Sequence, residues 1–144
     1  MLTAIRRMSK LESNGCRFRL DNSEIAVVAP KGTLSEEDRT VIRAHRDDIA
    51  TMLTARTILS AAITQADAIL TGWHRTDRAT TIRDTARSLV TNVETDLATA
   101  IDSHDQPSVE SMMSQVRFVA RRIVEHTSES VTLQGWPCGN LRFD

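Results

Sequence analysis

The spacing of the hydrophobic positions changes along the chain, and each spacing predicts a different element. Apolar residues first recur at helical intervals: Leu2, Ile5, Met8 and Leu11. This pattern predicts a short amphipathic helix. The helix should end at Asn14-Gly15, because glycine readily takes the left-handed conformation of a helix cap.

After Gly15 the hydrophobic spacing becomes two, which predicts β-strands. Two short alternating runs lie on either side of an Asp-Asn-Ser turn, and together they predict a β-hairpin. One face should pack inward and carry Phe18, Leu20, Ile25 and Val27. The other face should be exposed and carry Arg17, Arg19, Ala26 and Val28.

The region after the hairpin contains a helix start and then a polar run. Ser35 with Asp38 three positions later is typical of a capping box, which predicts that a helix begins there. The polar residues 46–48 predict a short break. From Ile49 onward the heptad spacing of a long helix takes over, with one arginine in its seam: Ile49, Met52, Arg56, Leu59, Ile63, Ala66, Leu70 and Trp73.

Two further apolar stripes predict two more long helices, over residues 82–101 and 109–127. Polar turns around residues 74–77 and 104–107 separate the three helices, so they should pack as an antiparallel bundle. The sequence therefore predicts an α+β fold, mostly α. A small α-β-β-α-α module covers residues 1–55, and an antiparallel three-helix bundle covers residues 56–130. Residues 131–144 lack a helical period and are predicted to form an irregular or short-strand tail.

Composition narrows the classes of function. The 144 residues carry 18 basic and 19 acidic side chains, and this balance excludes a strongly basic nucleic-acid coat protein. Aromatic residues make up 3% and tyrosine is absent, which argues against stacking platforms for single-stranded nucleic acid. We expect a cytoplasmic protein with reduced thiols, because we find no signal-peptide core, no membrane span and only two cysteines, far apart.

The residue types that usually carry out catalysis do not fall into a recognisable pattern. There is no glycine-rich phosphate loop, and the four histidines lie far apart in the sequence. Cys16 is expected in the core, and Cys138 is the better candidate for a reactive thiol, although no histidine is clearly placed to activate it. We therefore expect that the protein is not an enzyme and that it has no cofactor and no metal site.

Residues 2–53 resemble the TubC N-terminal docking domain family. The resemblance rests on the order helix, Gly15, a strand with Arg17 and Arg19, a polar turn and a second strand. Further matching positions follow: residues 29–35, Arg39, Ile42, Arg43, His45 and residues 48–53. The resemblance implies an α-β-β-α-α fold, often dimeric, that receives the carboxyl-terminal segment of an upstream synthetase subunit. Where a synthetase would continue into a condensation domain, this sequence continues with helices.

A hairpin of this kind can bind an extended segment, because the edges of a two-stranded sheet have unpaired backbone groups. Arg17, Arg19 and Lys31 could select acidic side chains of the partner, and Ala26 and Val28 could provide an apolar surface. The alternative interpretation is that the two strand arginines form the solvated face of a half-buried hairpin.

Arginines of the bundle suggest a second surface. They fall into two groups, which would meet if the last two helices are antiparallel: Arg75, Arg78, Arg83 and Arg87, and Arg117, Arg121 and Arg122. Such a basic patch could contact nucleic acid or an acidic protein. The alternative is that these charges pair with neighbours on the helix surfaces.

These observations favour a non-enzymatic adaptor that docks a segment of another protein on its hairpin, with a homodimer as a further expectation. One alternative is a small phage or mobile-element accessory protein that inhibits a host complex. The other is a nucleic-acid-associated accessory factor that uses the basic end of the bundle. No membrane partner is expected.

Overall fold

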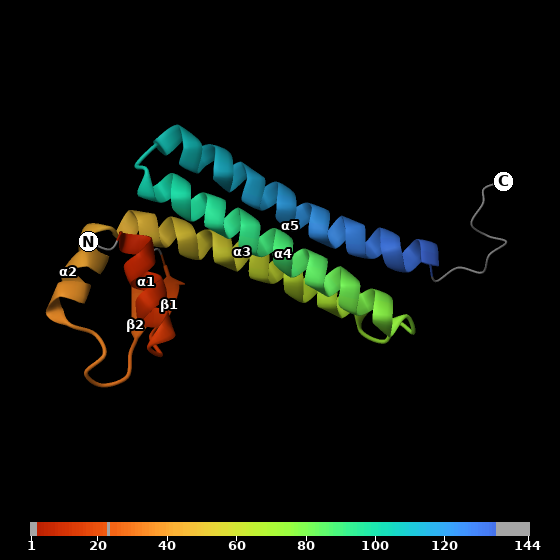
Figure 1. Ribbon diagram of the computed structural model, residues 1–144, viewed down its shortest axis with the longest axis horizontal. Coiled ribbons are helices and arrows are strands. Elements are labelled where there is room, and N and C mark those ends of the chain that lie inside the picture. The colour runs from red at the N-terminus through yellow and green to blue at the C-terminus, as the bar shows by residue number, and fades with distance from the viewer. Residues whose placement is uncertain (1–2, 23, 135–144) are drawn as a thin grey trace.

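The computed structural model describes residues 3–22 and 24–134 and has an α+β, mostly α architecture (Figure 1). Its elements follow in this order: α1 (Ala4–Ser13), β1 (Arg17–Asp21), β2 (Glu24–Val28), α2 (Glu36–Ala44), α3 (Arg46–Leu70), α4 (Thr76–Asp102) and α5 (Gln106–Gln134). This order confirms the predicted fold class. In Figure 1 the hairpin, α1 and α2 gather at one end of three long helices that lie side by side.

Helix α1 begins and ends where the local sequence predicts. The Thr3 hydroxyl accepts a hydrogen bond from the backbone N–H of Arg6 at 3.2 Å, which caps the amino-terminal end. Gly15 follows the helix with a φ of +99°. A Cβ at this position would lie 3.1 Å from Cγ of Pro30, so glycine allows both the turn and the close approach of the loop after β2.

The hairpin shows the predicted faces in β1, whereas Ile25, Ala26 and Val27 of β2 are all half-buried, so the exposed position predicted for Ala26 is wrong. Strands β1 and β2 pair antiparallel, with Arg17 opposite Val28 and Arg19 opposite Ala26. Phe18 and Leu20 are half-buried against the core, while the two arginines of β1 are exposed. The alternation of burial along β1 therefore follows the period of two in the sequence.

The capping box at the start of α2 is formed. The Asp38 backbone N–H donates to Ser35 Oγ at 3.1 Å, and the Ser35 backbone N–H donates to Asp38 Oδ2 at 3.0 Å. The break predicted at residues 46–48 is wrong. The break between α2 and α3 lies just before these residues and consists of His45 alone. The polar residues instead form the first turn of α3, where Asp47 and Asp48 suit the positive end of the helix dipole.

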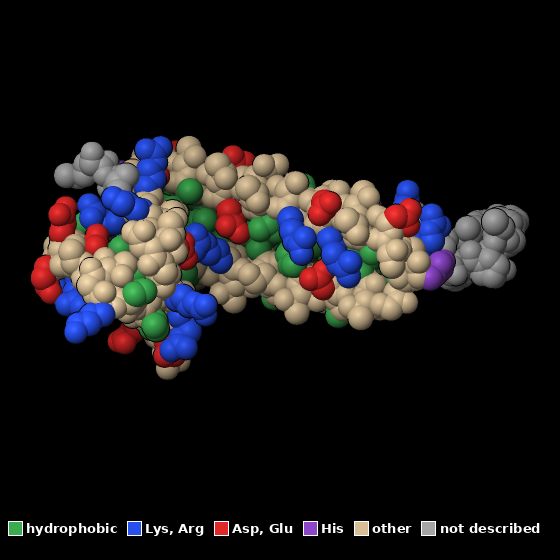
Figure 2. Space-filling view, turned by 60° about the horizontal axis from the view of Figure 1, so that its bottom comes forward, with side chains coloured by type: hydrophobic (Ala, Val, Ile, Leu, Met, Phe, Trp, Pro, Cys, Tyr) green, Lys and Arg blue, Asp and Glu red, His purple; other side chains and the backbone are tan. Residues whose placement is uncertain are grey.

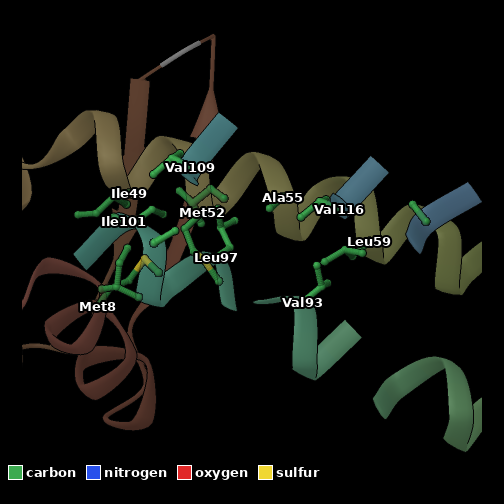
Figure 3. Close-up of a cluster of buried hydrophobic side chains, with 14 of the residues drawn as sticks. Met8, Ile49, Met52, Ala55, Leu59, Val93, Leu97, Ile101, Val109 and Val116 are labelled. Atoms are coloured by element: carbon green, nitrogen blue, oxygen red, sulfur yellow. The ribbon is translucent and has the colours of Figure 1, made fainter. Parts of the chain in front are cut away.

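One core joins the amino-terminal elements to the bundle (Figure 3). Met8 of α1, Ile49 of α3 and Leu97 of α4 belong to the same buried cluster, together with Val116 of α5. Helix α3 passes through residues 55 and 56 without interruption. The domain boundary that the sequence predicts there thus falls within a continuous helix whose two halves share one core.

Helix α5 continues to Gln134, four residues into the segment predicted to be an irregular tail. Val131 extends the inward stripe of α5 by one step of four from the buried Thr127. It packs against a small cluster at the far end of the bundle: Leu70, Trp73, Ala79 and Ile82. Residues 135–144, the rest of the predicted tail, lie outside the described residues.

Threonine side chains hydrogen-bond back to their own helices. The hydroxyls of Thr54 and Thr57 donate to the carbonyl oxygens of Ala50 and Leu53 at 2.8 and 2.9 Å. The buried Thr127 donates to the Ile123 carbonyl at 2.7 Å. These bonds satisfy the hydroxyls without a partner from another helix. They do not change the fact that threonine is a weak helix former.

The shared core predicts that the amino-terminal part does not fold alone. A fragment of residues 1–56 would expose Met8, Ile49 and Met52 to water, because α4 and α5 cover them in the intact chain. We expect the fragment to show no cooperative thermal transition by circular dichroism, whereas the full chain unfolds in one transition. A cooperative transition of the fragment would contradict this prediction.

Candidate partner-binding surface

The outer face of the hairpin is available for contacts. Val28 is 68% exposed, and Leu89 and Phe118 are the other large hydrophobic residues that lie exposed within residues 3–22 and 24–134. Arg17 lies directly opposite Val28 in the register, so a charged and an apolar side chain stand side by side. Ala26 is half-buried and lies opposite Arg19, and Lys31 is exposed in the loop after β2.

The same face also carries two acidic side chains that were not predicted to belong to it. Asp21 and Glu24 pair across the strands next to the turn, and the alternation of the strands places them on the arginine face. Arg19 Nη2 lies 3.9 Å from Asp21 Oδ2, with both side chains mostly exposed. Figure 2 accordingly shows basic side chains at the hairpin end of the molecule with acidic ones among them.

A trough runs between the edge of β1 and helix α3. It has a volume of about 320 Å³ and is lined by Phe18, Arg19, Leu20, Leu53, Arg56, Thr57 and Ser60. The two charged residues in this lining are both arginines. Its walls on the α3 side include the small, exposed side chains of Thr57 and Ser60, which leave the trough open.

The backbone of β1 points hydrogen-bonding groups toward this trough. Asp21 and Glu24 form the last pair of the ladder, and the pair that closes a tight hairpin is hydrogen-bonded. Because hydrogen-bonded and non-hydrogen-bonded pairs alternate, Phe18 and Leu20 direct their backbone N–H and C=O groups away from β2. The sheet has only these two strands within the described ranges, so no other described strand pairs with this edge of β1.

Arg56 connects three helices at the end of the trough. Its Nη1 donates to Glu12 Oε2 of α1 at 2.7 Å, and its Nε lies 3.9 Å from Glu94 Oε2 of α4. Burial raises the pKa of the Glu94 carboxyl, Arg56 opposes this rise, and the charge of Glu12 adds to it. The arginine in the heptad seam is therefore accommodated by two carboxylates.

A second ionic cluster fixes α2 against α1. Arg7 Nη1 donates to Asp38 Oδ1 at 2.8 Å, and its Nη2 lies 3.4 Å from Glu37 Oε1. The hydrogen bond from the Ser35 backbone N–H, together with the Arg7 guanidinium, lowers the pKa of the Asp38 carboxyl. This carboxylate thus caps α2 and holds it to α1 at the same time.

The arginines of the predicted basic patch line different grooves of the bundle. Arg83 and Arg87 line the groove between α3 and α4, Arg117 that between α3 and α5, and Arg122 that between α4 and α5. Arg121 lies over the ring of Phe118 at 5.8 Å. Arg75 is half-buried and Arg78 is exposed.

Two of these arginines, Arg83 and Arg122, have acidic partners. Arg83 Nε lies 3.0 Å from Asp67 Oδ1. Arg122 Nη1 lies 3.1 Å from Glu125 Oε1 and 3.5 Å from Glu129 Oε1. For Arg83 and Arg122, the structure agrees with the interpretation of surface charges that pair with their neighbours.

The structure also shows how metal-ligating side chains, cysteines and apolar helices are distributed in the part of the chain that it describes. No group of three or more metal-ligating side chains gathers there. Cys16 is a buried free thiol, and Cys138 lies outside the described residues. None of the described helices is both long enough and apolar enough to cross a bilayer.

No family model matches this chain, and searches of curated proteins and of solved structures likewise returned no match. The resemblance to the TubC docking family therefore stays an expectation from the sequence.

The raised pKa of Glu94 predicts a stabilising substitution. Because folding raises this pKa above its ordinary value of 4.5, the folded state favours the protonated carboxyl, and stability falls as the pH rises through the folded value. We expect Glu94→Gln to unfold at a higher temperature than the wild type at neutral pH. The difference should shrink as the pH is lowered below 4.5. Thermal melts over this range measure it, and a less stable variant at neutral pH would contradict the prediction.

Asp38 predicts the opposite dependence on pH. Folding lowers its pKa below the ordinary value of 3.8, so its contribution is present above that value and is lost as the pH falls through the lower folded value. We expect Asp38→Asn to be less stable than the wild type at neutral pH, with the two curves converging in acid. Urea unfolding at several pH values tests this expectation, and a constant difference down to strong acid would refute it.

Proposed function

We propose that this chain is a non-enzymatic adaptor that docks an extended, acidic segment of another protein on its β-hairpin. The observation that carries the proposal is the exposed outer face on which Arg17 and Arg19 stand beside the exposed Val28. The edge of β1 that no other described strand occupies supports it, because an extended segment can pair there as a third strand.

The distribution of charge supports a protein partner over nucleic acid. A nucleic-acid contact needs several cations on one surface to displace counterions from the phosphates. Arg83, Arg117 and Arg122 line three different grooves, and two of them pair with nearby carboxylates. By contrast, Arg17 and Arg19 project from one face of one strand.

The bundle acts as the support of the hairpin in this proposal. The inward face of the hairpin packs on the core that α1, α3, α4 and α5 share. A hairpin in isolation is only marginally stable in water. Held against the bundle, its outer face is presented in a fixed conformation, which reduces the entropy lost on binding.

Reversal of the hairpin charges tests the proposed function. A library of displayed random peptides is selected on the wild type and on Arg17→Glu/Arg19→Glu. We expect the wild type to enrich acidic peptides and the variant to recover them about tenfold less, since each exposed pair contributes up to about 1 kcal/mol. Arg78→Glu/Arg87→Glu is the matched control, because it makes the same charge change on α4.

Three results would reject the proposed function: no enrichment of acidic peptides on the wild type, equal recovery by the hairpin variant, or an equal loss in the α4 control. In the last case, binding would depend on total charge rather than on the hairpin. A gel shift with duplex DNA at two salt concentrations is run on the same proteins. Salt-sensitive DNA binding that the hairpin variant retains would favour the nucleic-acid alternative.

A further inference from the structure

Helix α1 ends in a glycine that is followed by a buried residue. The backbone N–H of Cys16 donates to the Leu11 carbonyl at 3.0 Å, and the N–H of Gly15 donates to the carbonyl two residues back from the helix end at 3.1 Å. These two bonds form a Schellman motif, in which the residue after the glycine contacts an apolar residue in the last turn of the helix. Leu11 and Cys16 are accordingly both buried.

The chain after α5 has the sequence pattern of the end of α1. Val131 is followed four positions later by Gly135 and then by Trp136, which is the spacing of the apolar residue, the glycine and the buried residue in α1. After α3 a glycine is likewise followed by a buried residue: Gly72 has a φ of +83°, and Trp73 is buried. The pattern therefore predicts that Trp136 turns back onto Val131.

The far end of the bundle has a buried donor that lacks an acceptor. Trp73 Nε1 is buried and makes no hydrogen bond within the described residues, and such a donor is costly to leave unpaired. Trp73 and Val131 belong to one cluster, three residues before the end of α5 at Gln134. In Figure 1 the turn between α3 and α4 and the end of α5 lie at the same end of the molecule. The chain beyond Gln134 could therefore supply the acceptor.

An apolar groove between α4 and α5 begins at the same cluster. It has a volume of about 250 Å³, and its apolar walls are Ile82, Ala86 and Leu89 of α4 with Ile123 of α5. Ile82 also belongs to the cluster around Trp73, and Leu89 is 42% exposed. The arginine in the lining, Arg122, already pairs with two glutamates. The groove therefore selects its occupant by apolar contact rather than by charge.

The segment of residues 135–144 has the length and the side chains to fill this groove. Arg122, at the distant part of the groove, lies twelve residues before Gln134, which is about 18 Å along the helix. Residues 135–141 span about 23 Å when extended. The segment includes Trp136, Leu141 and Phe143. Because it is covalently attached, its effective concentration is high, and a few apolar contacts suffice to hold it.

We propose that residues 135–144 fold back at Gly135 and close the far end of the bundle, with Trp136 against Val131 and Leu141 in the α4–α5 groove beside Leu89. This surface is separate from the hairpin, so the inference does not depend on the proposed function. The groove then takes a segment of the chain itself, and the outer face of the hairpin stays available for another protein.

Disulfide trapping tests the location of the segment. Cys138 lies between Trp136 and Leu141, so folding back brings it close to Thr85, an exposed residue in the groove lining. Thr80 is an exposed threonine outside the lining, about 140° away around α4. With oxidised glutathione as oxidant, we expect Thr85→Cys to form a disulfide with Cys138 about tenfold faster than Thr80→Cys does. Mass spectrometry of the linked peptides measures both rates.

Three results of this experiment would overturn the proposal. Equal rates in the two variants would show that the segment does not lie in the groove, since Thr80 is the nearer of the two to the start of α4. A ratio that persists in urea would show that it does not depend on the fold. Disulfides between two chains that increase with protein concentration would show that a second copy occupies the groove.

Fluorescence tests the turn at Gly135. Trp73→Phe leaves Trp136 as the sole tryptophan, and we expect acrylamide to quench it several-fold less in the folded protein than in urea. In this background Gly135→Ala should restore much of the quenching, because a left-handed conformation disfavours residues with a Cβ. Gly139→Ala is the matched control, with the same change in the same segment, and should have no effect.

Equal quenching of Trp136 in the folded protein and in urea would contradict the turn, and so would an equal effect of the two glycine substitutions. Melting curves verify that each variant folds. The disulfide measurement retains Trp73, so it decides the proposal even if Trp73→Phe does not fold.

Discussion

The structure depends on the burial of the first half of α3, which is covered from two directions. Ile49, Met52, Leu53 and Ala55 of this helix are all buried. These positions span more of the helix circumference than a heptad stripe does, so one neighbouring layer could not cover them. Helix α1 and the hairpin cover one side, and α4 and α5 cover the other. The hairpin is held in place because it completes this core.

Arg56 occupies a position of α3 that contacts both α1 and α4. At this position the helix faces α1 and α4, and each contributes one glutamate to the arginine. A half-buried network of this kind adds little free energy, because desolvation offsets much of the attraction. It does require α1, α3 and α4 to meet in one arrangement, since any other would leave a charge without a partner.

Local patterns in the sequence predicted most of the elements. The period of two gave the faces of the hairpin, and the Ser35–Asp38 spacing gave the start of α2. The break before α3 was misplaced because a polar run is equally compatible with a loop and with the acidic first turn of a helix. The end of α5 was placed too early because Val131 packs on the cluster that contains Leu70 and Trp73, and local periodicity does not reveal contacts between helices.

The candidate site was predictable only in part. Arg17 and Arg19 followed from alternation along β1, and the same alternation could have placed Asp21 and Glu24 beside them. The trough could not be predicted, because it arises where a strand edge meets a helix. Arg56 and Glu12 are hydrogen-bonded although they are 44 positions apart. The distribution of the bundle arginines over three grooves likewise depends on how each helix is rotated about its axis.

The threonines in the helices affect how incomplete chains resist proteolysis. Side chains such as Thr54 and Thr57 bond to their own helix and add little to its intrinsic stability, so the helices persist because they are packed together. A nascent or truncated chain without α5 would leave α3 and α4 uncovered on one side. Proteases cleave such open chains, so incomplete copies of this protein would be degraded.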